Sequence, residues 1–309
     1  MNRNIFITTH GLKISKHGNY LMVKGKDLNE KIPVGAFDNV FVLANVNFTA
    51  QVLKFLSKNG KWVFIINTSG KLQSIVAPQL LTSATSNREK QYRKFENKSL
   101  RIFLVKELLF YKANLSYKAI EKFRKAQGLH PLNYSFYKDF LKDVNSMIER
   151  SDSIEVLRGV DGFIMRTIYT EFATSIKNYF QFKTRSYHPP KDEANAVLSF
   201  VFSMFYSLLI PLIISQGLDP YFGFFHEKRG RHAALSSDLM ELARPELVFF
   251  AADILNKGYF EKSDFKTFKD GVYLKPKATK VLCKLFMEKI NFSNIMFPIR
   301  YFIKEEILK

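Results

Sequence analysis

Hydrophobic and polar positions change their period near residue 80. Before that point, short apolar runs separated by turn residues predict β-strands. The expected strands are residues 5–8, 12–15, 20–23, 40–43, 62–66 and 72–76. One helix is expected at residues 49–57, because Val52, Phe55 and Leu56 recur at helical spacing before Asn59 and Gly60. We therefore predict a small β-rich domain over residues 1–80.

After a polar linker at residues 81–87, the apolar positions recur every three or four residues, which is typical of helices. Helices are predicted at residues 88–114, 134–147, 154–180, 194–215, 235–255, 275–290 and 293–308. Residues 257–273 are predicted to form a loop, and Pro245 to kink the helix around it. The whole chain is thus predicted to be an α+β protein, with an all-α domain over residues 88–309.

Residues 194–215 form a stretch of 22 residues without a charge, which is long enough to span a bilayer. The stretch contains the polar residues Asn195, Ser199, Ser203 and Ser207, and the sequence has no second segment of this kind. We therefore expect a central helix covered by other helices, and no membrane partner.

Composition places the chain among globular proteins. It has 309 residues, of which 47% are hydrophobic and 24% charged, enough for one large or two ordinary domains. A single cysteine, Cys283, excludes an internal disulfide framework and the obvious thiolate metal sites. A reducing intracellular setting is therefore expected, and the absence of an apolar N-terminal run of signal-peptide length also favours the cytoplasm.

The net charge of +19 favours a phosphate-bearing partner, with nucleic acid ahead of a membrane surface or a merely soluble basic protein. The positive charge is spread along the chain except at residues 131–255, where 13 basic side chains meet 15 acidic ones. Such basic clusters are often only solvated surface. The candidates for phosphate contacts are Arg88, Arg93, Lys94, Arg101, Lys228, Arg229 and Arg231.

The candidate chemistry lies in residues 223–245. Asp238 and Glu241 are three residues apart, so they share one helix face, and a turn at residues 228–231 would bring His226 back toward them. An imidazole with carboxylates suits Mg²⁺ or Mn²⁺ better than zinc. Alternatively, Asp238 and Glu241 are acids in the first turn of a helix, in a variant of the capping box.

A third carboxylate, Asp161, lies on the apolar stripe of the helix predicted at residues 154–180. A carboxylate on a core-facing stripe is costly unless it is paired or bound to a cation. The flanking Gly159 and Gly162 are expected to permit close approach of another chain segment. The alternative is a buried ion pair with Arg158 or Arg166.

Four motifs in order along the chain resemble those of the CRISPR adaptation integrases, metal-dependent, endonuclease-like proteins that insert new spacers into a repeat array. The motifs are LRGVDGFIMRTIY (157–169), KDEANAVLSFVFSMFYSLL (191–209), GLDPYFGFFHE (217–227) and the run from Leu235 to Pro245. A weaker match is LVKELLFYKANL (104–115), where Lys112 and Asn114 approximate the family's Lys-x-x-Asn pattern. The sequence departs from the family at Asp161, where the family usually has glutamate.

This resemblance implies an N-terminal β domain that dimerises and a helical domain that holds the catalytic site. It implies Asp161, His226 and Glu241 as ligands of Mg²⁺ or Mn²⁺, with Asp238 beside them as a supporting or alternative ligand. The implied reaction is attack of the 3′-hydroxyl of a DNA fragment on a phosphodiester at the edge of a repeat. The implied partners are DNA, a second copy of the chain and a small second adaptation protein of ferredoxin-like fold.

Two other functions stay open from the sequence. One is a structure-selective, metal-dependent DNA nuclease outside adaptation, which would share the site without the repeat specificity. The other is a non-catalytic DNA-binding assembly subunit, which the aspartate at position 161 makes plausible.

Overall fold

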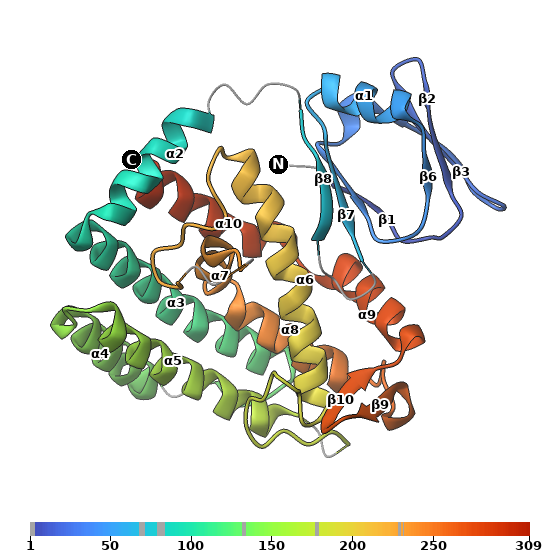
Figure 1. The fold of residues 1–309 in the computed structure, drawn as a ribbon. Helices are drawn as coiled ribbons and strands as arrows, with labels where there is room; N and C mark the ends of the chain where they lie inside the picture. The colour runs from blue at the N-terminus through green and yellow to red at the C-terminus, as the bar shows by residue number, and fades with distance from the viewer. Residues whose placement is uncertain are drawn as a thin grey trace.

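Two β-sheets at the N-terminal end of the chain stand beside a larger group of helices (Figure 1). The computed structural model describes residues 4–67, 72–78, 84–131, 134–176, 179–227, 230 and 232–309. The predicted α+β class is confirmed. Most of the predicted linker at residues 81–87 lies within α2 (Ala84–Glu96), while residues 81–83 are outside the described part.

Each N-terminal sheet has four strands. The first has the order β1 (Asn4–Ile7), β5 (Asn39–Val42), β7 (Trp62–Ile66) and β8 (Leu72–Val76), with β8 antiparallel to its neighbour. The second has the order β4 (Asn29–Pro33), β3 (Tyr20–Lys24), β2 (Lys13–His17) and β6 (Asn47–Phe48). Helix α1 (Ala50–Lys58) contacts both β2 and β7. The strands β4 and β6 are not predicted from the sequence, because β4 is polar and mostly exposed and β6 has only two residues.

The first sheet is buried on both faces. Val40 and Val63 point into the N-terminal core, whereas Phe41 and Phe64 belong to the large core of the helical region. The Phe41 and Phe64 rings stack with their centroids 5.0 Å apart. This burial explains why β5 and β7 are continuous apolar runs without alternation. The helices therefore pack directly against this sheet.

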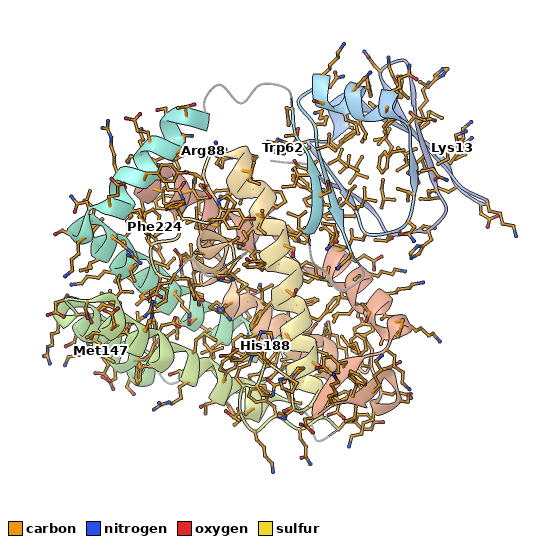
Figure 2. All side chains as sticks on the ribbon, in the orientation of Figure 1. Lys13, Trp62, Arg88, Met147, His188 and Phe224 are labelled. Carbon is orange, nitrogen blue, oxygen red and sulfur yellow. The ribbon has the colours of Figure 1, made fainter. Side chains whose placement is uncertain are left out.

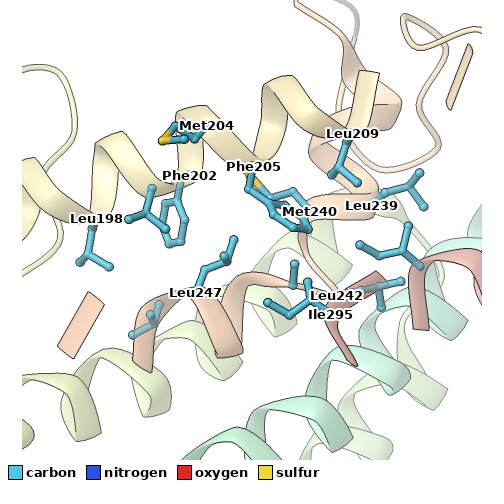
Figure 3. Close-up of a cluster of buried hydrophobic side chains, with 14 of the residues drawn as sticks. Leu198, Phe202, Met204, Phe205, Leu209, Leu239, Met240, Leu242, Leu247 and Ile295 are labelled. Atoms are coloured by element: carbon cyan, nitrogen blue, oxygen red, sulfur yellow. The ribbon is translucent and has the colours of Figure 1, made fainter. Parts of the chain in front are cut away.

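The helical region is arranged around α6 (Glu193–Ser215). Its other helices are α2, α3 (Lys98–Ala126), α4 (Tyr134–Arg150), α5 (Ile154–Ser175), α7 (Ala234–Met240), α8 (Arg244–Asn256), α9 (Pro276–Lys289) and α10 (Phe292–Phe302), followed by a π-helical turn at Ile303–Ile307. Side chains of α6 such as Phe205 and Leu209 face Leu239 and Met240 of α7 (Figure 3). In the described part of the chain, α6 alone is long and apolar enough to cross a membrane, but 67% of its most apolar window is buried inside the protein. The predicted central, covered helix is confirmed.

Two predicted helices are each split in the structure. The helix expected at residues 88–114 breaks between α2 and α3, where the Asn97 side chain accepts the N–H of Leu100 at 3.0 Å and so begins a new helix. The helix expected at residues 235–255 breaks between α7 and α8. Pro245 lies in the first turn of the second of these helices, which begins at Arg244, instead of kinking a single helix, because the first turn needs no N–H at that position.

Other boundaries also differ from the prediction. Helix α3 runs on to Ala126, past residue 114. Helix α5 ends at Ser175, short of residue 180. The loop expected at residues 257–273 contains a short 3₁₀ turn (Lys262–Asp264) and an antiparallel hairpin of β9 (Phe265–Phe268) and β10 (Gly271–Leu274). The helical region therefore carries a small β element and is not all-α.

Candidate metal centre

The candidate site lies where α3, α5, α7 and the loop before α7 meet. All seven residues of α7 are buried, so Glu241, which directly follows it, is held inside the protein with 2% of its side chain exposed. Phe224 belongs to the loop between α6 and α7 and lies in the interior beside α3 (Figure 2). The site is thus assembled from segments far apart in the sequence.

Asp238 organises the loop that carries His226. Its Oδ2 accepts the N–H of Phe224 at 2.5 Å and that of Phe225 at 3.1 Å, and its Oδ1 accepts the N–H of His226 at 2.8 Å. A Cβ on Gly223 would lie 2.7 Å from Asp238 Oδ2, so only glycine permits this close approach. Asp238 therefore positions the loop. The capping-box alternative is wrong, since α7 begins at Ala234 without a side-chain cap.

The His226 imidazole is oriented by the same carboxylate. Its Nδ1 lies 2.8 Å from Asp238 Oδ1, which makes Nδ1 the protonated nitrogen and leaves the Nε2 lone pair free. Nε2 lies 3.9 Å from Glu241 Oε1. Burial lowers the pKa of His226, but the hydrogen bond and charge of Asp238 together with the charge of Glu241 raise that pKa above its ordinary value.

Lys112 of α3 joins the other two carboxylates. Its side chain is completely buried, and its ammonium contacts Asp161 Oδ1 and lies 2.5 Å from Glu241 Oε2. Burial would lower the pKa of Lys112, yet the charges of Asp161 and Glu241 raise it. Arg244 Nε donates to Glu241 Oε1 at 2.7 Å. Burial alone would raise the pKa of Glu241, but Arg244 and Lys112 hold it well below its usual range.

Asp161 is the most accessible of the buried carboxylates, with 22% of its side chain exposed. The expected ion pair exists, but its partner is Lys112; Arg158 pairs instead with Glu227 at 2.9 Å. The expected close approach at Gly159 and Gly162 is wrong. A Cβ on either glycine would meet nothing within 4 Å among the described residues. Both glycines therefore face open space, at about 160° and about 100° around the helix from Asp161.

Asp161 and His226 both lie close to Glu241, the first through Lys112 and the second at 3.9 Å, but the three side chains do not form a preassembled metal cage. Within the described ranges, no group of three His, Cys, Asp or Glu side chains is placed to hold a metal ion. The donor set of two carboxylates and an imidazole nevertheless suits a Mg²⁺ or Mn²⁺ ion. A positive charge already lies between the two carboxylates, namely the Lys112 ammonium. The residues therefore fit a cation at this point.

The predicted phosphate-binding residues have different surroundings. Arg101 Nε donates to the carbonyl of Phe224 at 2.7 Å, and Lys94 donates to the carbonyl of Glu306 at 2.6 Å, so both serve contacts inside the protein. Arg93 is exposed and pairs with Glu89 at 2.5 Å. Arg88 is half-buried, and its Nε has no hydrogen-bond partner in the described structure. Lys228, Arg229 and Arg231 lie outside the described residues.

Sequence reasoning missed Lys112 and Arg244 as members of the site. Lys112 lies on a stripe of α3 that is otherwise apolar or small, with Leu108, Leu109 and Ser116. A charged residue on a buried stripe was the signal that singled out Asp161, and it applies equally to Lys112. Arg244 follows Glu241 by three residues, a spacing that brings side chains together within a helical turn.

Comparison with known proteins places this site in a family. The family "CRISPR associated protein Cas1" matches residues 5–288. A Cas4/Cas1 exonuclease–endonuclease fusion from Leptospira interrogans is 28% identical over 293 residues, which cover 91% of this chain and 54% of the fusion. A CRISPR-associated endonuclease Cas1 from Fusobacterium nucleatum is 22% identical, over 94% of this chain and 85% of that protein.

Solved structures share the fold. A Cas1 protein from Thermotoga maritima matches with a TM-score of 0.76 at 20% identity, over 99% of this chain and 97% of that one. A partial Cas6-RT-Cas1–Cas2 complex matches with a TM-score of 0.73 at 19% identity, over 99% of this chain and 93% of that one. A casposase bound to an integration product matches with a TM-score of 0.66 at 20% identity, over 98% of this chain and 96% of that one.

Fold and sequence together define an enzyme that acts on DNA. The chain belongs to the Cas1 family. Its function is that of a Cas1 endonuclease and integrase of CRISPR adaptation. The Cas1 family is generally metal-dependent.

Proposed function

We propose that Asp161, His226 and Glu241 bind one Mg²⁺ or Mn²⁺ ion and that the protein joins the 3′-hydroxyl of a DNA fragment to a phosphodiester of a CRISPR repeat. The observation that carries this proposal is the convergence of side chains from α5, the 217–227 loop and the end of α7. When bound, the ion would polarise the target phosphodiester and help to activate the attacking hydroxyl.

The protein's own residues supply orientation. Asp238 fixes the tautomer and direction of His226, and Arg244 holds Glu241 through Oε1. Asp161 has 22% of its side chain exposed, so a DNA backbone can reach the centre from this side. These contacts support a site whose buried side is preorganised and whose exposed side receives substrate.

The proposed partners are DNA, a second copy of the chain and Cas2. The net charge of +19 supports binding of both the fragment and the repeat. The fold shared with the Cas1 in a Cas2-containing complex supports Cas2 as the small ferredoxin-like partner. We also propose that residues 1–80 mediate dimerisation and that the protein acts in the cytoplasm, where its DNA substrates lie.

The test uses purified protein, a labelled fragment with a free 3′-hydroxyl, a supercoiled plasmid bearing the repeat, and Mn²⁺, with and without Cas2. Joining of the label to the plasmid at a repeat edge is the expected result. A plasmid of the same size without the repeat is the control. Branched DNA cut without repeat preference would favour the structure-selective nuclease.

One observation sets a condition on metal binding. The Lys112 ammonium lies between the two carboxylates, where the proposed ion would have to bind. If neither joining nor cleavage occurs with Mn²⁺ and Cas2 while DNA is still bound, the protein is an assembly subunit.

A further inference from the structure

We propose that Lys112 is an internal counter-ion that keeps the metal-free centre assembled, and that a divalent ion binds only when it displaces the Lys112 ammonium from between Asp161 and Glu241. This inference rests on the proposed metal centre and deepens it. It makes the lysine side chain and the metal alternative occupants of one position.

The contacts of Lys112 support this role. Its side chain has no exposed surface, and its ammonium contacts one oxygen of each carboxylate, on two different elements, α5 and the segment after α7. Without a cation there, two carboxylates would lie close together in a poorly solvated site and would repel each other. The ammonium therefore has the structural effect expected of a bound cation.

Simultaneous occupancy is unfavourable. An ammonium and a divalent ion that share the same two carboxylates would be only a few ångströms apart, and their repulsion is weakly screened in a buried site. Arg244 adds a third positive charge on the other oxygen of Glu241. Of the two side-chain cations, the Arg244 guanidinium is the better anchored, because its Nε donates to Glu241 Oε1 and the group lies over the Phe202 ring. The Lys112 ammonium is therefore the one that leaves.

Lys112 has a way to leave. A lysine carries its charge on a flexible four-carbon stem, so Nζ can move while the backbone of α3 stays in place. Asp161 is the exposed end of the pair, with 22% of its side chain accessible, whereas Glu241 has 2%. The ammonium can therefore turn toward solvent on the side where DNA would approach.

The first experiment measures Mn²⁺ binding by electron paramagnetic resonance in the full-length protein and in Lys112→Met. Because no ammonium has to be displaced, the variant should bind Mn²⁺ about tenfold more tightly. Its melting temperature without metal should fall, and saturating Mn²⁺ should raise it by more than in the unmodified protein. Lys122→Met, on the same helix but in an exposed pair with Glu246, is the matched control and should behave like the unmodified protein.

Unchanged or weaker Mn²⁺ binding by Lys112→Met would show that lysine and metal coexist and would overturn the inference. Glu241→Gln separates this failure from failure of the proposed centre. If Glu241→Gln binds Mn²⁺ as tightly as the unmodified protein does, the metal is elsewhere and the proposed centre itself fails. If Glu241→Gln weakens binding while Lys112→Met does not strengthen it, only the lysine inference fails.

A second measurement does not depend on the folding of Lys112→Met. In protein labelled with ¹⁵N-lysine, a buried and hydrogen-bonded ammonium gives a slowly exchanging signal, which Lys112→Arg identifies by its loss. Addition of diamagnetic Mg²⁺ should remove or shift this signal without unfolding the protein. A signal unchanged at a Mg²⁺ concentration that saturates the site would overturn the inference.

Discussion

His226 and Asp238 are joined twice: the carboxylate Oδ1 lies 2.8 Å from the imidazole Nδ1 and also accepts the backbone N–H of His226 at 2.8 Å. One side chain thus fixes both the loop and the ring that the loop carries. The free Nε2 is consequently aimed at Glu241. Removal of the ring and removal of the carboxylate should therefore have different effects.

His226→Ala should abolish Mn²⁺-dependent joining while leaving the fold nearly unchanged. The ring is about one-third exposed, and Asp238 keeps its three backbone partners without it. The free energy of unfolding should change by less than about 1 kcal/mol, which chemical denaturation can measure, and DNA binding should persist. A loss of a few kcal/mol, as in core truncation, would show that His226 is a structural residue.

Asp238→Asn is the contrasting variant. It keeps the shape of the side chain but removes the charge that orients His226, so Mn²⁺ affinity should fall by roughly 10- to 100-fold. It should also be clearly less stable than His226→Ala, because one amide oxygen replaces two carboxylate oxygens as acceptor for three backbone N–H groups. Equal stability of the two variants would contradict the assigned role of Asp238.

The raised pKa of His226 predicts opposite pH trends for metal binding and for stability of the metal-free protein. Protonated imidazole cannot ligate a metal, so Mn²⁺ affinity should rise with pH through a midpoint above the ordinary value of 6.5. The imidazolium stabilises the metal-free protein at pH values below 6.5, and this contribution is lost as pH rises through the folded-state pKa. Mn²⁺ binding and chemical denaturation, both measured from pH 5.5 to 8.5, check the two trends. Neither pH trend should appear in His226→Ala.

Two glycines near the site should respond to alanine in opposite ways. A Cβ on Gly223 would lie 2.7 Å from the backbone carbon of Ala234, so Gly223→Ala should displace the loop, lower the melting temperature and reduce joining. Gly162 is in α5 with open space around it, so Gly162→Ala should stabilise the protein by up to about 1 kcal/mol. If Gly162→Ala is more stable but joins DNA more slowly, the open surface of α5 at Gly162 is needed for substrate approach.

The sequence predicts most of the elements, because apolar periodicity reports which faces are buried. It fails where that signal is absent. The edge strand β4 is polar, and the hairpin of β9 and β10 has only one fully buried residue per strand. The breaks at Asn97 and before Arg244 interrupt the apolar stripes only briefly. The apolar pattern therefore predicts one continuous helix in place of α2 and α3, and another in place of α7 and α8.

The candidate site is predictable as a set of ligands but not as a set of contacts. Asp161, His226 and Glu241 stand out through their chemistry and through family motifs. The pairing of Lys112 with Asp161 and Glu241 joins residues 49 and 129 positions apart, and no local spacing reports such a contact. The use of Arg101 to hold Phe224 is hidden for the same reason, because a basic residue near a helix start looks equally suited to phosphate.

DNA binding should be steeply salt-dependent, because counterion release dominates for a chain of net charge +19. Neutralising Arg88, Arg93 and Lys94 together should flatten the slope of log affinity against log salt. Arg93→Ala alone should reduce that slope by about 1, whereas Lys94→Ala should also lower stability through its lost contact with Glu306. Lys13→Ala, at the outer edge of the N-terminal sheets (Figure 2), is the control, and an equal effect there would place the DNA elsewhere.

Asp161 offers the sharpest test of the centre, because it is the more exposed of the two proposed carboxylate ligands and contacts Lys112. Asp161→Asn keeps the shape of the side chain and leaves Lys112 its contact with Glu241, so the fold should persist. Removal of the negative charge should nevertheless abolish most Mn²⁺ binding and joining. Asp161→Glu keeps the charge and lengthens a side chain that is partly exposed, so it should retain joining. Full activity of Asp161→Asn with Mn²⁺ would exclude Asp161 from the site, and loss of activity in Asp161→Glu would show that the centre is fitted to the shorter side chain.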